Sequence, residues 1–384
     1  MRAFRIGEVR APLLHTQMVQ KVGAGQRRVI ISPSDRRRNM DKNMTSPTPI
    51  LDALQRPFRD LRISVTDRCN FRCTYCMPAE VFGARFHFLP KSALLSFEEI
   101  TRLTRIFLGF GARKVRLTGG EPLLRHEIEK LVAMLAALPG LNDLAMTTNG
   151  YLLPKKAAAL RAAGLTRLTV SLDSLDNDVF RRLNGGFADV DDVLAGIQAA
   201  EQAGFTPLKI NTVVQRGVND HTIVELARTF RERGHIVRFI EYMDAGTLNA
   251  WRMEDVVPAR EIVERIDAEM PLEPLQPNYA GEVARRYRYR DGGGEIGVIA
   301  SVTQPFCGGC TRLRLSAEGE LYTCLFAAKG TPLRDAMREG ADDAKLAEMI
   351  RAVWQARTDR YSELRTQATP EQKRGKVEMY HIGG

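Results

Sequence analysis

Two kinds of apolar period alternate along the chain from residue 61 onward. Short apolar runs of strand character occur at Leu61–Val65, Lys114–Leu117, Leu144–Thr148, Leu168–Leu172, Leu208–Val214 and Val237–Tyr242. Apolar residues at helical spacing follow these runs at Phe97–Leu108, Ile128–Leu138, Lys155–Ala163, Asp176–Leu183, Val190–Ala203 and Thr222–Arg233. Strands that alternate with helices predict an α/β fold with a parallel sheet and right-handed crossovers. The pattern leaves two architectures open, an open doubly wound sheet and a partial barrel.

Residues that could bind a metal or a ligand lie where the predicted strands end. They are Cys69–Cys76, Gly119–Pro122, Thr147–Gly150, Ser171–Asp173 and Glu241–Asp244. The carboxyl ends of parallel strands meet at one edge of a sheet or barrel, where ligands bind. The sequence therefore predicts one site built from several loops.

The pattern changes after about residue 275. A linker is marked by Pro271, Pro274 and Pro277, and alternating residues predict antiparallel strands at Arg286–Arg290 and Glu295–Ile299. Helical spacing returns at Pro332–Arg338 and Lys345–Arg357. We predict a basic disordered extension at 1–45, the strand-and-helix domain at 46–275 and a smaller α+β domain at 276–384.

The charge of this 384-residue chain is concentrated at its N-terminus. The formal net charge is +10, and residues 1–44 alone carry ten Lys or Arg against three acids, so the rest of the chain is only +3. The first 44 residues lack a sustained amphipathic period, which favours disorder. An organellar transit peptide, and a true start at Met40 or Met44, stay open as alternatives. Interleaved aromatic residues are missing from this segment, which argues against nucleic-acid binding.

All six cysteines fall into two triplets, Cys69, Cys73 and Cys76, and Cys307, Cys310 and Cys324. Thiolates are soft ligands that suit iron–sulfur clusters, zinc or copper(I), so two metal centres are predicted. Structural zinc takes four closed ligands, and the histidines offer neither triplet an obvious local fourth. Two 4Fe-4S clusters, each with one iron open to a small molecule, fit the count better.

Other uses of the cysteines fit the sequence less well. Zinc with a distant fourth ligand stays open. With no signal peptide or membrane-length apolar span in view, we expect a cytoplasmic location, where thiols stay reduced and disulfides are rare. A thioredoxin-like role for Cys307 and Cys310 would leave Cys324 and the first triplet unexplained.

The first triplet lies in a motif. The segment Cys69–Cys76 resembles the CxxxCxxC signature of the radical S-adenosylmethionine superfamily, and Gly119–Pro122 resembles its GGEP motif. The similarity spans about residues 58–245. It implies a six-stranded partial barrel and reductive cleavage of S-adenosylmethionine to a 5′-deoxyadenosyl radical. Three thiolates leave one iron free for the cofactor, and a glycine pair permits close backbone approach.

The second triplet indicates which family within this superfamily the chain resembles. Its Cys-x2-Cys-x13-Cys spacing, the following Thr311–Arg314 and the terminal Gly383-Gly384 are similar to the GTP 3′,8-cyclase family, whose members are lyases of molybdenum cofactor biosynthesis. This similarity runs from about Leu54 to the C-terminus and includes Arg62–Arg68 before the first cysteine. It implies two 4Fe-4S clusters, and a glycine tail that enters the active site.

The family resemblance also implies roles for single residues. The predicted S-adenosylmethionine contacts are Tyr75, Gly120, Ser171 and Met243. The predicted GTP contacts are Arg62, Arg116, Thr147, Lys209, Arg312, Leu313 and Arg314. Arginine and lysine suit a triphosphate by their charge. No catalytic residue is predicted beyond the cluster ligands. The implied partners are an electron donor of unknown identity and, downstream, cyclic pyranopterin monophosphate synthase. No nucleic acid or membrane is expected, and a homodimer stays open.

Taken singly, these residues have plainer interpretations. Gly119-Gly120 alone suggests a turn, Met243 a core residue, and Ser171 or Thr147 a cap. Arg312 and Arg314 alternate on a predicted strand, so a solvated face is the default, although the neighbouring cysteines favour function. Two other function classes stay open: a peptide-modifying radical S-adenosylmethionine enzyme with an auxiliary cluster, and a non-enzymatic iron–sulfur electron carrier.

Overall fold

A computed structural model describes residues 49–365 and 375–383 of the chain. The predicted basic extension, residues 1–45, and the final residue Gly384 lie outside the described residues. All described helices and strands belong to the unit that spans Ser46–Gly384.

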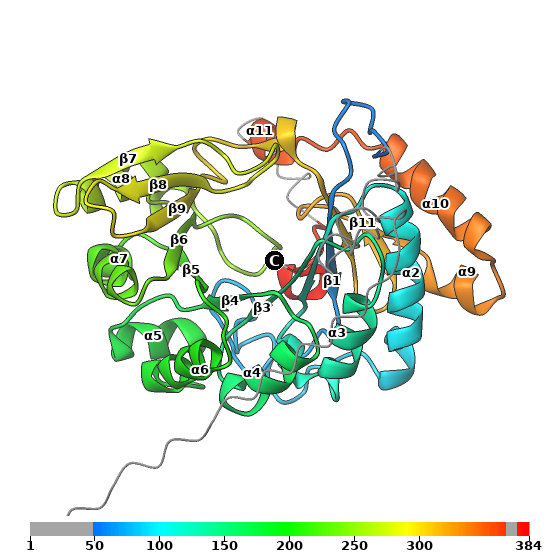
Figure 1. The fold of residues 1–384 in the computed structure, drawn as a ribbon, viewed down its shortest axis with the longest axis horizontal. Coiled ribbons are helices and arrows are strands. Elements are labelled where there is room, and N and C mark those ends of the chain that lie inside the picture. The colour runs from blue at the N-terminus through cyan, green and yellow to red at the C-terminus, as the bar shows by residue number, and fades with distance from the viewer. Residues whose placement is uncertain (1–48, 366–374, 384) are drawn as a thin grey trace, which may run out of the picture. The chain divides into compact units, whose positions relative to one another are not determined.

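Six parallel strands form the centre of the fold (Figure 1). They are β1 (Asp60–Ser64), β2 (Lys114–Thr118), β3 (Asp143–Thr148), β4 (Arg167–Ser171), β5 (Lys209–Val214) and β6 (Ile236–Glu241). Each strand pairs in parallel with the next one along the chain. A doubly wound sheet reverses its strand order at a switch point, and this sheet does not. The partial-barrel prediction is therefore confirmed and the open doubly wound alternative is wrong.

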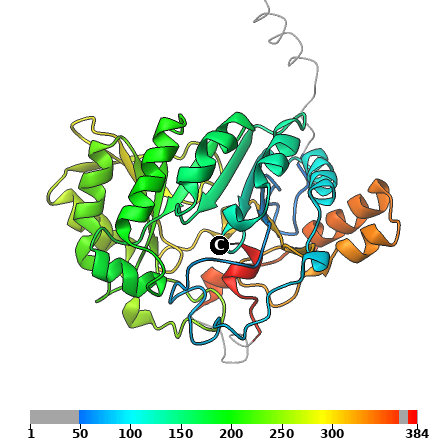
Figure 2. The same ribbon diagram turned by 90° about the horizontal axis from the view of Figure 1, so that it is seen from below.

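Helices cover the outer side of the curved sheet, as Figures 1 and 2 show. They are α2 (Phe97–Gly109), α3 (Ile128–Ala136), α4 (Leu153–Ala162), α5 (Asn177–Asn184), α6 (Val190–Gln202), α7 (Ile223–Glu232) and α8 (Ala259–Asp267). Helix α2 begins with a capping box between Ser96 and Glu99, and its apolar stripe is buried. Among the helices described, none is both long and apolar enough to cross a membrane.

The C-terminal part of the chain extends the same sheet at both edges. At one edge β9 (Glu295–Ile299) pairs in parallel with β6 and carries β8 (Arg285–Tyr289) and β7 (Leu272–Leu275). At the other edge β10 (Arg312–Leu315) pairs in parallel with β1 and carries β11 (Glu320–Tyr322) and β12 (Thr331–Pro332). The predicted antiparallel pair β8–β9 is confirmed. Strands from both sides of residue 275 share one sheet, so the sheet does not mark a boundary there. The domain division at residue 275 stays a prediction.

Short helices complete the C-terminal part. They are α9 (Arg334–Arg338), α10 (Asp343–Gln355), α11 (Tyr361–Leu364) and α13 (Met379–Ile382). Helix α10 packs through the fully buried Trp354, whose ring centroid lies 5.3 Å from that of Phe58. Helix α13, red in Figure 1, lies beside β1 inside the curve of the sheet.

Candidate active site between two cysteine triplets

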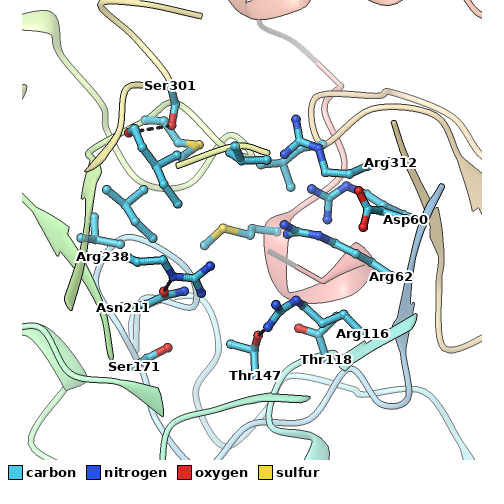
Figure 3. Close-up of a pocket in the computed structure, with 18 of the residues that line it drawn as sticks. Asp60, Arg62, Arg116, Thr118, Thr147, Ser171, Asn211, Arg238, Ser301 and Arg312 are labelled. Carbon is cyan, nitrogen blue, oxygen red and sulfur yellow. Dashed lines mark hydrogen bonds between the residues drawn. The ribbon is translucent and has the colours of Figure 1, made fainter. Parts of the chain in front are cut away.

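A cavity of about 320 Å³ lies inside the curve of the sheet, and all six cysteines line it. The alternation of side chains along each strand explains which residues line the cavity. Ile63 of β1 is fully buried in the core, whereas its neighbour Arg62 faces the cavity (Figure 3). The same alternation brings polar residues of β2 to β6 inward. The prediction that several strand-end loops build one site agrees with this arrangement.

The loop of the first triplet is anchored from two sides. The backbone N–H of Thr74 donates to the carbonyl of Leu183 at 3.0 Å, at the end of α5. On the other side, the N–H of Gly120 donates to the carbonyl of Thr66 at 2.8 Å. A Cβ on Gly120 would lie 2.2 Å from the carbonyl oxygen of Arg68. The glycine pair is thus required for backbone packing directly before Cys69, in addition to any approach to a ligand.

Glu121 follows the glycine pair and joins two of the predicted loops. Its Oε1 accepts bonds from the hydroxyl of Thr148 at 2.8 Å and the N–H of Leu123 at 2.9 Å. Its Oε2 accepts a bond from the N–H of Asn149 at 2.8 Å. Burial raises the pKa of Glu121 to about 7, against the lowering effect of these hydrogen bonds. The sequence signal was present in the GGEP motif, but the motif alone did not show that the carboxylate holds the third strand end.

A second acid lies near the same triplet. The Tyr75 hydroxyl, from the cysteine loop, donates to Oδ2 of Asp173 at 2.7 Å, and the N–H of Val213 donates to Oδ1 at 2.9 Å. Burial raises the pKa of Asp173 to about 6 although both hydrogen bonds oppose that effect. Burial, reinforced by the charge of Glu121, also raises the pKa of the Cys69 thiol to about 12. This end of the cavity therefore carries acidic side chains and favours a cationic ligand.

The second triplet has basic surroundings. Nε of Arg312 donates to Sγ of Cys310 at 3.3 Å, and Nη1 of Arg357 donates to the carbonyl of the same cysteine at 2.8 Å. Nη1 of Arg56 donates to the carbonyl of Cys307 at 2.9 Å. Burial by itself would raise the pKa of Cys310, but the charges of Arg312 and Arg357 lower it to about 6. The basic side chains thus favour the Cys310 thiolate, whereas burial and the charge of Asp359 raise the pKa of Cys324 to about 11.

The geometry of the thiols bears on which metal they could hold. In neither cysteine triplet, all of whose residues are described, do the three Sγ atoms lie within 4.8 Å of one another. Thiolates around a single zinc ion are about 3.8 Å apart, because each Zn–S bond is about 2.3 Å and the geometry is tetrahedral. The three thiols of neither triplet are therefore spaced as around a single zinc ion.

The register of the strands builds a row of cations between the two triplets. Arg62 of β1 pairs with Arg116 of β2 on one side and with Arg314 of β10 on the other. Like charges directly opposite each other destabilise a sheet, so this row is costly unless an anion occupies the cavity. In the part of the chain that the structure describes, the side chains of Arg62 and Lys209 have no hydrogen-bond or ion-pair partner.

Burial and mutual repulsion lower the pKa values of two arginines of this row and of two further lysines of the cavity. Burial is the larger cause, and neighbouring cations add to it; the pKa falls to about 9 for Arg62 and Arg116, about 8 for Lys114 and about 7 for Lys209. Buried cations with few acids between them mark a binding site for a multiply charged anion.

The cavity brings together ten of the eleven residues predicted to contact the cofactor or the nucleotide. These ten are Tyr75, Gly120, Ser171, Met243, Arg62, Arg116, Thr147, Lys209, Arg312 and Arg314. The eleventh, Leu313, has its side chain fully buried in the core on the opposite face of β10. Arg314 is 2% exposed, so the interpretation of a solvated strand face is wrong for it. Thr147 accepts a bond from Nη1 of Arg116 at 2.8 Å (Figure 3), which orients that guanidinium.

Sequence reasoning missed several polar residues of the cavity. They are Lys114, Arg167, Asn211 and Arg238. Nε of Arg238 donates to Oδ1 of Asn211 at 2.9 Å, on adjacent strands (Figure 3). The available signal was the alternation of charged and apolar residues within predicted parallel strands, which are normally apolar on both faces.

The C-terminal tail reaches the same cavity. Met379 and Tyr380 of α13 line it, and the carbonyl of Gly383 accepts a hydrogen bond from Nη1 of Arg314. Gly383 has a φ of +72°, and a Cβ there would lie 2.2 Å from Cγ2 of Thr118. The predicted glycine tail therefore lies at the site as far as Gly383, while Gly384 is outside the described residues.

Sequence comparisons agree with this architecture. The family model described as Radical SAM superfamily matches residues 63–230, and the model described as Molybdenum Cofactor Synthesis C matches residues 235–363. The GTP 3′,8-cyclase of Acidothermus cellulolyticus is 61% identical over 83% of this chain and 89% of its own length. The chain belongs to the GTP 3′,8-cyclase family.

Other members of this family match along nearly their whole length. The GTP 3′,8-cyclase of Xanthomonas campestris is 51% identical over 88% of this chain and 98% of its own, and that of Staphylococcus carnosus is 47% identical over 87% and 99%. Among solved structures, Streptococcus suis SuiB bound to its precursor peptide SuiA superposes with a TM-score of 0.55 at 16% identity, covering 86% of this chain and 76% of SuiB. This last similarity concerns the fold alone.

Proposed function

We propose that this protein is a GTP 3′,8-cyclase, a radical S-adenosylmethionine lyase that converts GTP to 3′,8-cyclo-7,8-dihydro-GTP in the first step of molybdenum cofactor biosynthesis. One observation carries the proposal: all six cysteines and a row of buried cations line a single cavity. Family membership supports the same activity.

At the acidic end, Cys69, Cys73 and Cys76 hold a 4Fe-4S cluster with one open iron. Tyr75, Gly120, Ser171 and Met243, which line this part of the cavity, position S-adenosylmethionine. This cofactor carries a positive sulfonium centre, which suits the acids Glu121 and Asp173. Held there, the cluster and the cofactor would supply the 5′-deoxyadenosyl radical needed to remove the hydrogen atom from ribose carbon 3′ of GTP.

At the basic end, Cys307, Cys310 and Cys324 would hold a second 4Fe-4S cluster, which would supply an iron site for the guanine of GTP. Arg312 and Arg314 lie next to it on β10. Arg62 and Arg116 of the row, together with Lys209 of β5, bind the triphosphate, because arginine donates in pairs and lysine contributes a compact charge. We add Lys114 and Arg238 to this group, since both line the same part of the cavity.

This placement holds the ribose of GTP between the two ends. Carbon 3′ then faces the acidic end while the base stays fixed, so that carbon 3′ and carbon 8 of guanine form a bond and one electron plus one proton complete the product. Positioning of two reacting atoms is a large contribution to rate. The tail residues Met379 and Tyr380 line the cavity and limit access of water to a radical. An electron donor and a downstream cyclic pyranopterin monophosphate synthase follow from this role.

Iron analysis together with product analysis tests the proposal. Anaerobically reconstituted protein should bind about eight iron atoms per chain, as two cubane clusters require. With a reductant, S-adenosylmethionine and GTP, it should form 3′,8-cyclo-7,8-dihydro-GTP, detected by mass spectrometry. Loading that stays near four iron atoms, or zinc in the second triplet, would contradict the two-cluster assignment. Turnover of a peptide in place of GTP would instead support a peptide-modifying enzyme.

A further inference from the structure

A buried carboxylate joins three segments of the chain next to the cavity. Asp244 directly follows Met243 after β6 and is 5% exposed. Its Oδ1 accepts a bond from Nε of Arg365 at 2.8 Å, and its Oδ2 accepts one from Nζ of Lys376 at 2.8 Å and another from the Tyr361 hydroxyl. Nζ of Lys376 also donates to the Asp244 carbonyl at 2.9 Å.

Two aromatic rings lie against the same two cations, Arg365 and Lys376, that contact this carboxylate. Phe326 and Tyr361 stack with centroids 4.3 Å apart, and Nζ of Lys376 lies 4.5 Å from the Tyr361 centroid. The guanidinium of Arg365 lies 5.5 Å from the Phe326 centroid. Cations over ring faces are stabilised when desolvated. Because Phe326 is two residues after Cys324, these contacts connect the second cysteine triplet to the loop that carries Met243.

Burial would raise the pKa of Asp244, but the charge of Arg365 and the hydrogen bonds from Lys376 and Tyr361 outweigh it and lower the pKa. The carboxylate is therefore ionised, and both cations are nearly as buried, Arg365 at 6% and Lys376 at 7% exposed. Removing a single anion from such a cluster leaves two buried charges without compensation, which is strongly unfavourable.

The same carboxylate marks where the C-terminal tail enters the site. After Lys376, the N–H of Val377 donates to the carbonyl of Ala327 at 2.9 Å, and Oε1 of Glu378 accepts a bond from the N–H of Thr247 at 2.9 Å. The tail then continues through Met379 and Tyr380, which line the cavity, to Gly383 at Arg314. Nη1 of Arg365 donates to the carbonyl of Ser301, a further cavity residue, at 2.9 Å.

We propose that Asp244 is a positioning residue that holds the C-terminal tail, Gly375–Gly383, in the cavity and thereby couples cleavage of S-adenosylmethionine to cyclisation of GTP. This inference rests on the proposed function for the role of the tail. With the tail fixed, the radical is formed in a cavity closed around GTP. With the tail loosened, the cofactor is still cleaved but the substrate is held less firmly, so 5′-deoxyadenosine accumulates without a matching amount of product.

The test compares Asp244→Asn with the parent enzyme, both loaded with clusters. Amide hydrogen exchange in the peptide covering 375–383 should become at least about tenfold faster, because local opening of this segment costs less. The ratio of 5′-deoxyadenosine to cyclised GTP should rise from near one to several. Asp255→Asn is the matched control: this residue lies on the same connection after β6 but pairs with the exposed Arg252, and both readouts should stay at the parent values.

A second variant covers the case in which Asp244→Asn fails to fold. Lys376→Met keeps the pair between Asp244 and Arg365 and the length of the side chain, and it removes the bonds from Lys376 to Asp244. It should reproduce the faster exchange and the excess of 5′-deoxyadenosine. Parent-like exchange and a parent-like ratio in Lys376→Met would overturn the inference while GTP cyclisation by the parent enzyme leaves the proposed function standing. If the parent forms no cyclised GTP, the proposed function itself fails, whatever the exchange rates.

Discussion

The two cysteine triplets have the same number of thiols and opposite electrostatic surroundings. Around the first, burial and the charge of Glu121 raise the pKa of Cys69 to about 12, and the charge of Arg72 only partly opposes them. Around the second, Arg312 and Arg357 overcome the effect of burial and lower the pKa of Cys310 to about 6. The difference comes from the charged side chains around the thiols, not from the number of cysteines.

This contrast explains how one cavity could hold two unlike ligands in a fixed order. A cationic cofactor is favoured at the acidic end and a polyanionic nucleotide at the basic end, so each is disfavoured where the other binds. The number of cysteines predicts two metal centres, but it does not show which centre lies near acids and which near cations. The polarity lies in the strand register that places Arg62 between Arg116 and Arg314.

The largest effect should come from removing one ligand at each end. Cys324→Ser should halve the iron content to about four atoms per chain and abolish GTP cyclisation, while cleavage of S-adenosylmethionine continues. Cys73→Ser should also lose about four iron atoms but should lose cofactor cleavage as well. Iron analysis and quantification of 5′-deoxyadenosine separate the two variants. If both lose cleavage equally, the two ends do not divide the work as proposed.

Next in size is the effect of the arginines at the basic end. Arg312→Ala and Arg314→Ala should each lower kcat/KM for GTP by about ten- to a hundredfold, because a charge-assisted hydrogen bond contributes about 1.5–3 kcal/mol. Iron content and the yield of 5′-deoxyadenosine per cluster should stay unchanged.

A surface arginine is the control for this comparison. Arg338→Ala removes an exposed guanidinium that pairs with Glu99, neither of which lines the cavity, and GTP kinetics should not change. Normal turnover in Arg312→Ala and Arg314→Ala would mean that the basic row does not select the nucleotide.

The sequence was sufficient for the order of the elements and for most of the lining of the cavity. Period-two and period-3.6 patterns locate β1 to β6 and their helices, and the spacing of the cysteines identifies both triplets. It was not sufficient for contacts that depend on register across distant segments. Asp244 looks like any residue after a strand, because Arg365 and Lys376 meet it only in three dimensions.

Leu313 illustrates the opposite error. A motif treats Thr311–Arg314 as one unit, whereas alternate residues of a strand face opposite sides. The side chain of Leu313 is therefore in the core, and only the flanking Arg312 and Arg314 face the cavity. Strand period, applied within the motif, would have separated the three residues.

A smaller effect is expected from closing the space at the end of the tail. Gly383→Ala should lower GTP turnover about tenfold, since the residue has a φ of +72° and its Cβ would lie 2.2 Å from the methyl group of Thr118. Gly375→Ala is matched in conformation, with a φ of +90°, but its Cβ would contact nothing within 4 Å. Turnover should fall in the first variant only, measured as product formed under the same anaerobic conditions. Equal losses in both would assign the effect to backbone strain rather than to the contact with Thr118.

The smallest expected effect is a change in proton binding when GTP binds, which tests whether the triphosphate lies at the basic end of the cavity. Burial, with repulsion from Arg238 and other cations, lowers the pKa of Lys209 to about 7, so the amine is mostly neutral at pH 8 in the empty cavity. The terminal phosphate of GTP is already ionised at that pH. Its charge favours the ammonium form and raises the pKa of Lys209, so binding of GTP should take up close to one proton. Affinity should correspondingly fall as the pH rises above 7, by at most about tenfold per pH unit for one proton.

Anaerobic calorimetry at pH 8, in two buffers of different ionisation enthalpy, measures this uptake directly. Lys209→Met should remove most of it, because the methionine keeps the apolar stem and has no titrating group. Lys114→Met should remove less, since the pKa of Lys114 is lowered only to about 8 and Asp60 opposes the effect of burial. Undiminished uptake in Lys209→Met would show that the triphosphate does not lie against this lysine, and the basic end would then have to bind GTP through β1, β2 and β10 alone.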